Sequence, residues 1–123
     1  MTEAGLEFIN QELLGLGINY EFGEWTSEIV YPYWVGNFIE VPSDDGPAET
    51  TFILEGFTRG SKLELLQVKG VIEKHFEHGI TAILENHSGV AVVYSDANSD
   101  IPTGNANLKK IQVNLTVKEW KVN

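Results

Sequence analysis

The sequence predicts an α+β fold in which two helices pack on one face of a largely antiparallel sheet of about four to six strands. Two segments space their apolar residues three and four positions apart, as a helix with one buried face does. The other apolar segments are short, rich in β-branched and aromatic residues and bounded by turns, as strands are. At 123 residues the chain has the length of one domain, so we expect a single domain over residues 1–123.

The first helix is predicted over residues 1–16. Its apolar residues lie on one stripe of a helix surface. They are Leu6, Ile9, Leu13 and Leu16. Gly15 and Gly17 end the pattern, as glycines commonly end helices.

Strands are predicted near residues 18–22 and, with an interruption, near residues 28–41. Both stretches consist mostly of β-branched and aromatic residues, which suit a pleated and partly buried surface. Pro32 removes a backbone donor, so we expect it at an edge or a bulge. The turn-forming stretch 42–47 (PSDDGP) leads into a third strand over residues 49–58, which predicts a hairpin with an acidic tip.

The third predicted strand carries apolar residues on both of its faces. Phe52 and Leu54 belong to one face, and Ile53 and Phe57 belong to the other. Strands with this pattern are covered on two sides. We therefore expect a helix over one face and a neighbouring subunit over the other.

The second helix is predicted to begin at Ser61 and to end before Gly79. Ser61 and Glu64 have the spacing of a capping box, in which each side chain satisfies a backbone donor near the other. The apolar stripe of this helix again has three- and four-residue steps. It consists of Leu65, Val68, Ile72 and Phe76.

The last third of the chain is predicted to form strands. Residues 80–84 and 90–94 are short apolar runs joined by a turn, which predicts a second hairpin. Residues 96–107 are polar and are predicted to form a loop. Residues 111–117 alternate strictly between apolar and polar, which is typical of an antiparallel strand with one face in water.

The net charge of the chain disfavours some classes of binding partner. Eighteen acidic and eight basic residues give a net charge of −10. Such a surface repels phosphate groups, which disfavours nonspecific binding to nucleic acids and to anionic membranes. It suits solubility, a partner with a basic surface, or a tube wall that repels passing DNA. With no cysteine and no signal-peptide pattern, we expect a cytosolic origin.

No pattern of catalysis, metal binding or cofactor binding emerges from the sequence. A nucleophile elbow and both glycine-rich phosphate loops are absent, and so is a thiol nucleophile. His75 and His78 could join a metal site but are more simply read as surface residues. We therefore predict that the chain is not an enzyme and has no metal site or cofactor.

Aromatic residues give the strongest functional indication. They are dense around an interrupted strand, where one small core cannot hide all of them, and such side chains are enriched at protein interfaces. An exposed patch of this kind usually marks a partner site. With the acidic turn included, the interface candidates are Trp25, Tyr31, Tyr33, Trp34, Phe38, Asp44, Asp45 and Phe57.

Four stretches spread over almost the whole chain resemble a known family. They are YPYWVG (31–36), TFILEGFTRG (51–60), TAILEN (81–86) and IQVNL (111–115). Their layout is similar to that of the small neck and tail-completion proteins of long-tailed phages and prophages of Gram-positive bacteria. The nearest type within that group is the tail terminator.

The resemblance implies a structural virion protein, assembled in the cytoplasm of the bacterial host. Terminators of this type are α+β proteins that close into a hexameric ring on the head-proximal end of the tail. The ring caps the tail-tube protein, ends elongation and offers a docking surface to the head connector, while DNA passes through without specific binding. No membrane is involved.

Other functions stay open at this stage. A head-completion or neck connector protein would share the layout. A small-molecule-binding module or enzyme would instead show a concave site with convergent polar groups and shifted pKa values. A regulator that binds a basic host protein through residues 43–47 is a lesser alternative.

Overall fold

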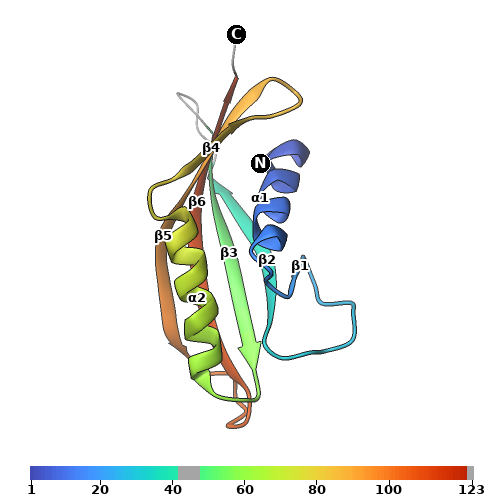
Figure 1. Cartoon of the computed structure of the whole chain (residues 1–123), viewed down its shortest axis with the longest axis vertical. Coiled ribbons are helices and arrows are strands. Elements are labelled where there is room, and N and C mark those ends of the chain that lie inside the picture. Colours follow the sequence, from blue (N-terminus) through green and yellow to red (C-terminus); the bar gives the residue numbers. More distant parts are fainter. Residues whose placement is uncertain (42–47, 122–123) are drawn as a thin grey trace.

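The computed structural model describes residues 1–41 and 48–121 and confirms the α+β fold (Figure 1). Its eight elements are α1 (Glu3–Gly15), β1 (Tyr20–Phe22), β2 (Tyr33–Val41), β3 (Ala48–Thr58), α2 (Lys62–Phe76), β4 (Ile80–Ile83), β5 (Ser88–Ile101) and β6 (Lys109–Lys121). No helix in these two ranges is long and apolar enough to cross a membrane.

The six strands form one sheet in the order β1-β2-β3-β6-β5-β4. Only β1 and β2 pair in parallel, and the other four pairs are antiparallel. The long strands β3 and β6 therefore lie in the centre, and the short strands β1 and β4 lie at the edges. Both helices pack on the same face of this sheet (Figure 1).

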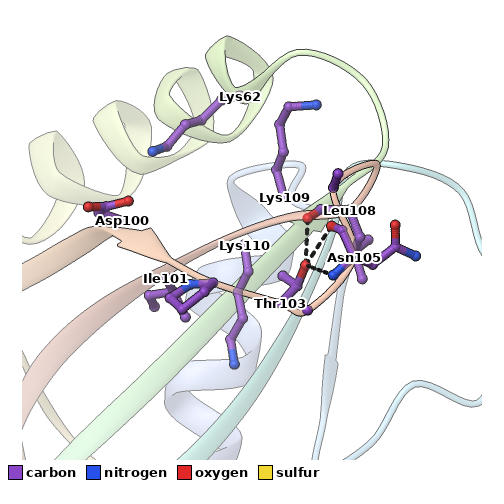
Figure 2. Close-up of a pocket in the computed structure, with 11 residues that line it drawn as sticks. Lys62, Asp100, Ile101, Thr103, Asn105, Leu108, Lys109 and Lys110 are labelled. Atoms are coloured by element: carbon purple, nitrogen blue, oxygen red, sulfur yellow. Dashed lines mark hydrogen bonds between the residues drawn. The ribbon is translucent and has the colours of Figure 1, made fainter.

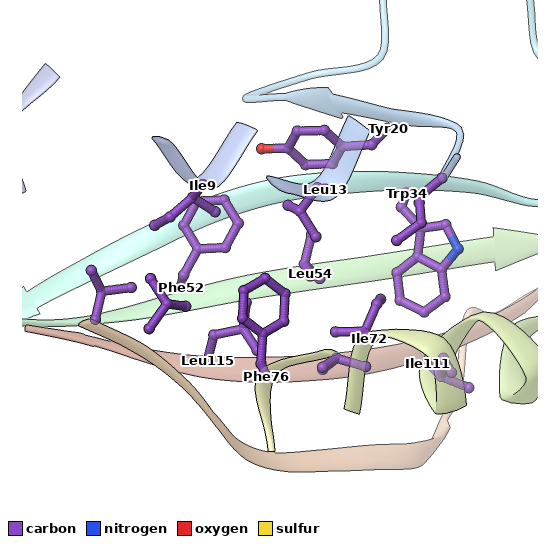
Figure 3. Close-up of a cluster of buried hydrophobic side chains, with 14 of the residues drawn as sticks. Ile9, Leu13, Tyr20, Trp34, Phe52, Leu54, Ile72, Phe76, Ile111 and Leu115 are labelled. Carbon is purple, nitrogen blue, oxygen red and sulfur yellow. The ribbon is translucent and has the colours of Figure 1, made fainter. Parts of the chain in front are cut away.

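The core lies between that face and the two helices (Figure 3). Ile9 and Leu13 of α1 and Leu65, Ile72 and Phe76 of α2 are fully buried against it. The sheet contributes every second residue of its central strands, because successive side chains of a strand point to opposite faces. These residues are Trp34, Phe52, Leu54, Val90, Val92, Ile111, Val113, Leu115 and Val117.

Two strand glycines make room for large rings in this core. Gly56 lies directly opposite Trp34 in the β2–β3 pair, and a Cβ at Gly56 would lie 2.6 Å from the indole ring. Gly36 is similarly close to Tyr20 and Phe52, at 2.7 Å from each side chain. The aromatic residues and the glycines opposite them are therefore one packing arrangement.

Each helix begins with a side-chain cap. Thr2 Oγ1 accepts a hydrogen bond from the Gly5 amide at 3.0 Å, and Thr2 is itself held by the carboxylate of Glu119. Ser61 caps α2 by accepting from the Leu63 amide at 3.2 Å. The second half of the expected capping box is wrong: the Glu64 carboxylate accepts from the Thr58 hydroxyl at 2.8 Å instead of from the Ser61 amide.

Two predicted boundaries are also wrong. The strand expected from residue 28 begins only at Tyr33, because the Asn19 side chain donates to the carbonyl of Val30 at 2.8 Å and holds this segment out of the ladder. The loop expected over residues 96–107 is part of β5 as far as Ile101. Asp96 of this segment accepts from the Asn114 side chain at 2.8 Å, whereas Ala97 packs against the core. The predicted turn over residues 42–47 lies outside the described residues.

Candidate interaction surface

The sheet face opposite the helices is not covered by any element in the described part of the chain. We call it the open face. Its side chains are the alternate residues of the same strands that build the core, and most of them are half-buried by their neighbours. From β2, β3 and β6 they are Tyr33, Val35, Asn37, Ile39, Thr51, Ile53, Glu55, Phe57, Lys110, Gln112, Asn114, Thr116, Lys118 and Trp120.

Four aromatic residues meet at one end of the open face and form what we call the aromatic strip: Trp25, Tyr31, Tyr33 and Phe57. Tyr33 and Phe57 are register partners in the β2–β3 pair, and their rings stack at 5.1 Å between centroids. Trp25 lies 4.9 Å from Tyr33 on the other side, and Tyr31 lies 5.7 Å from it. Rings at these separations stabilise one another beyond their burial.

Two cations border the strip. Lys110 is the register partner of Phe57 on β6, and its Nζ lies 5.6 Å from the centre of that ring, within cation–π range. The same Nζ is paired with the Glu55 carboxylate. Arg59 Nε donates to the Tyr31 hydroxyl at 3.1 Å. The strip thus presents flat aromatic surface with positive charge at its border.

The electrostatics of the strip reflect this packing. Burial raises the pKa of the Tyr33 hydroxyl, the nearby Tyr31 raises it further, and the Arg59 charge offsets part of the shift. Both effects keep Tyr33 neutral, so its hydroxyl stays available as a donor and acceptor.

The loop that carries Trp25 is held by one carboxylate. Glu21 accepts hydrogen bonds from the Thr26 hydroxyl at 2.7 Å and from the Ser27 amide at 3.2 Å. These bonds, led by that of Thr26, lower the pKa of Glu21 despite an opposing contribution from desolvation. Glu21 therefore positions Trp25 against Tyr33.

The structure separates the predicted interface residues into three groups. Trp25, Tyr31, Tyr33 and Phe57 come together in the aromatic strip. Trp34 is fully buried and Phe38 is half-buried, and both lie on the helix side of the sheet because they follow Tyr33 and Asn37 by one position. Asp44 and Asp45 lie outside the described residues.

Lys110 and Arg59 were missed as members of this surface. Lys110 lies just before the predicted alternating strand over residues 111–117, and only the register of β3 with β6 brings it to Phe57. Arg59 directly follows the predicted strand over residues 49–58. A row of cross-strand partners is not visible in one sequence.

A basic hollow of about 350 Å³ lies near the strip, between the start of α2 and the loop before β6 (Figure 2). Its lysines do not converge on one point: Lys109 Nζ donates to the Gly60 carbonyl at 2.8 Å, and Lys110 points away toward Glu55. Thr103 Oγ1 fixes the loop by donating to the carbonyls of Asn105 and Leu108, at 2.8 Å each. The hollow adds positive charge to this end of the molecule.

The histidines do not gather either. His75 Nε2 lies 3.8 Å from a Glu12 carboxylate oxygen and so links α2 to α1, whereas His78 is almost fully exposed beside Glu77. Within residues 1–41 and 48–121, no three histidine, cysteine or acidic side chains are placed to hold a metal ion.

A second hollow, which we call the helix groove, lies on the covered side of the molecule and has a volume of about 440 Å³. Its walls are the turn after α1, the segment at residues 30–32 and one side of α2. Trp34 is among its lining residues. The groove is mostly apolar, unlike the basic hollow.

Comparison with known proteins supports the fold alone. No protein-family model matches the chain, and no curated protein sequence matches it. Eleven chains of solved structures do match. One of them, a protein whose name states no function, is 12% identical, with a TM-score of 0.70 over 100% of this chain and 99% of that one. The fold is therefore shared as a whole, from α1 to β6.

Proposed function

We propose that this chain is a structural protein that assembles with copies of itself through the aromatic strip. The strip carries the proposal: four rings are held in fixed contact on a sheet face that no described element covers. Large aromatic side chains with arginine beside them are the residues that dominate binding at protein interfaces. A partner over the strip would bury the outer faces of these rings.

Charge favours a second copy of this chain as the partner. Four of the eight basic residues lie at the end of the molecule that carries the strip, namely Arg59, Lys62, Lys109 and Lys110. The chain as a whole has eighteen acidic residues, so most of its remaining surface is acidic. The cations beside the strip, of which Lys110 is already paired with Glu55, would meet the acidic flank of the next copy in a head-to-tail contact, and such contacts give a ring where the rotation closes.

The family resemblance gives this ring its proposed place. As a tail terminator it would sit on the head-proximal end of a phage tail tube, end elongation and receive the head connector, in the virion. Its partners would be the tail-tube protein and the connector, and DNA would pass through the acidic ring without specific binding. The alternative is a head-completion protein that forms the same ring.

Assembly can be tested by sedimentation velocity over a concentration series, alone and with the tail-tube protein of the same phage or prophage. We expect a species of about six copies, and a Tyr33→Gln/Phe57→Gln double variant should weaken its formation by tenfold or more. Leu14→Gln is the matched control, because Leu14 is 50% exposed on α1, which packs on the opposite face of the sheet from the strip.

Two results would contradict the proposal. One is a strict monomer at every concentration, also in the presence of tube protein. The other is assembly that the double variant and the control affect equally. Electron microscopy of particles that lack the protein then distinguishes the two roles. Abnormally long tails indicate a terminator, and unattached tails of normal length indicate a joining protein.

A further inference from the structure

The basic residues of the chain all lie in its second half. The first 58 residues contain eleven of the eighteen acidic residues and none of the eight basic ones. They supply α1 and the neighbouring strands β1, β2 and β3, which make one side of the sheet, whereas β6, β5 and β4 make the other side (Figure 1). The separation of charge along the sequence is therefore also a separation across the molecule.

The acidic side carries an exposed loop between β1 and β2, which we call the outer loop (residues 23–30). Glu24 and Glu28 are exposed on it, and neither forms an ion pair in the described part of the chain. Ile29 and Val30 end the loop and are 53% and 61% exposed. Exposed apolar side chains with polar residues around them are typical of a site that binds another protein.

The outer loop is held in place by hydrogen bonds at two points. Glu21 accepts from the Thr26 hydroxyl and the Ser27 amide in the middle of the loop. Asn19 Nδ2 donates to the Val30 carbonyl at its end, at 2.8 Å. A loop held in this way needs little ordering when a partner binds, which favours affinity.

On the basic side, α2 has apolar residues on its outer surface as well as in the core. Leu63 and Leu66 are 59% and 39% exposed. With Gly70 they follow one another at steps of three and four residues, so they lie on one side of the helix, which we call the α2 ridge. Val68 and Val71 line the helix groove instead, on the side of α2 that faces the turn after α1. The ridge is therefore turned away from α1.

Gly70 adds room to the ridge. An added Cβ at this position would meet no atom within 4 Å. Glycine in the middle of a helix weakens it, but the missing side chain allows another chain to come close to the backbone. The ridge thus combines exposed apolar side chains with a position where a partner can approach closely.

Lysines lie on and beside the α2 ridge. Lys74 continues its spacing by another four residues, and Lys62 lies at its start. Neither lysine forms an ion pair in the part of the chain that the structure describes, whereas Lys69 is paired with Glu73 at 3.7 Å. The acids of the outer loop and the lysines of the ridge are therefore complementary in charge.

We propose that the α2 ridge of one copy docks on the outer loop of a second copy, so that this loop is the acidic flank of the head-to-tail contact. The inference rests on the proposed self-assembly and names its two surfaces. A second copy is the partner that the charges favour, because both complementary surfaces lie on one chain, at opposite sides of the sheet (Figure 1). Surfaces arranged in this way are occupied in turn by successive copies. The contact joins the basic end at Lys62 to the Trp25 end of the next aromatic strip.

An exchange of charge between the two surfaces tests the contact. Leu63→Glu/Leu66→Glu gives the ridge the charge of the loop, and Glu28→Lys/Ile29→Lys gives the loop the charge of the ridge. The four side chains are exposed, so both variants should fold like the parent. Each variant alone should assemble more weakly by about tenfold or more, because its changed surface repels the unchanged surface of the next copy.

An equimolar mixture of the two variants should restore a species of the parent's size in sedimentation velocity. In the mixture the acidic ridge meets the basic loop and the unchanged ridge meets the unchanged loop, so the two variants alternate. Leu14→Glu is the matched control, because Leu14 is exposed on α1 outside both surfaces. This control should assemble like the parent, alone and in the mixture.

The inference is overturned if the ridge variant assembles like the parent, or if the mixture assembles no better than its components. The Tyr33→Gln/Phe57→Gln variant, measured beside them, keeps the two proposals apart. If it fails to assemble while the ridge and loop variants assemble normally, the strip proposal stands and the ridge contact is wrong. If the mixture recovers while the strip variant assembles like the parent, the ridge contact stands and the strip is not required. A parent that stays monomeric with tube protein contradicts both.

Discussion

The two faces of the sheet are made by the same strands but differ in how they are completed. On β3, Phe52 and Leu54 are fully buried beneath the helices, whereas Ile53 and Phe57 are only half-buried on the open face. Because successive side chains of a strand point to opposite faces, the residues of both faces alternate along the same strand. The two helices of the same chain cover one face. The open face keeps apolar surface that the described elements leave uncovered.

The difference extends to how each face fixes its aromatic residues. On the covered face, Trp34 is locked by shape against Gly56, with no space for even a Cβ. On the open face, Tyr33 and Phe57 are fixed by ring stacking and by the nearby charge of Lys110. Shape fixes the rings of the core, while stacking and charge fix rings that stay half-buried. In the proposed assembly, the covered face would provide stability and the open face would provide contact.

The largest effect should come from truncating one phenylalanine on each face. Phe52→Ala leaves a cavity beneath the helices and should lower the free energy of unfolding by about 3–5 kcal/mol. Phe57→Ala removes a stacked ring from a half-buried position and should cost the monomer less, about 1.5–2.5 kcal/mol, from the apolar area and the ring contact that it loses. Urea unfolding at low protein concentration measures both. Equal losses would remove the distinction between the two faces.

The same substitution at two glycines should give opposite signs. Gly56→Ala places a methyl group 2.6 Å from the Trp34 ring, and such overpacking costs about 1–3 kcal/mol. Gly70 lies within α2 with no atom within 4 Å of an added Cβ, so Gly70→Ala should stabilise by about 0.5–1 kcal/mol. Thermal unfolding compares the two variants with the parent. A Gly56→Ala variant as stable as the parent would show that the Trp34 ring can shift.

Two tyrosines, one on each face, should lower the stability of the fold at alkaline pH. Tyr20, at the edge of the core, donates to Asn10 at 2.6 Å, and its burial raises its pKa well above the ordinary value of 10.0. The folded state then keeps a proton that the unfolded chain releases, so stability is full below pH 10.0 and falls as the pH rises above it. Tyr33 has the same direction of shift on the open face.

Tyr20→Phe should therefore remove most of this alkaline loss, whereas Tyr33→Phe should remove a smaller part. Urea unfolding at several pH values from neutral to strongly alkaline measures it. If Tyr33→Phe had the larger effect, the aromatic strip would be more deeply buried than the core edge, which would contradict the comparison.

The sequence was most informative where one physical pattern determines the structure. The stripe from Leu65 to Phe76 predicted α2, and the alternation over residues 111–117 predicted β6, because burial of one face imposes each period. Both hairpins were also predicted. Residues 96–101 were misread because only Ala97 of this stretch packs against the core before Ile101, and two register shifts break the alternation, so the apolar signal is weak.

The site was less predictable than the fold. Aromatic content identified the right segment, but it could not say that Trp34 points into the core while Tyr33 points out. That depends on which residue of β2 begins its pairing with β3, and a shift of one position would exchange the two. The pairing of Lys110 with Phe57 depends in the same way on a register set across two strands. The helix groove, built from three separate segments, left no local pattern.

The smallest expected effect concerns the loop that holds Trp25 on the strip. Hydrogen bonds, first from Thr26, lower the pKa of Glu21 below its ordinary value of 4.5. The loop contact is therefore fully present above pH 4.5 and is lost as the pH falls through the lower folded value. In NMR spectra, the Ser27 amide and the Trp25 indole should shift together on acidification, and Glu21→Gln should weaken this dependence. Glu24→Gln is the matched control, since it removes the same charge from the same loop. Because the Trp34 indole takes no part in the Glu21 contact, it should not follow this titration; if it did, the two faces would be coupled through β2.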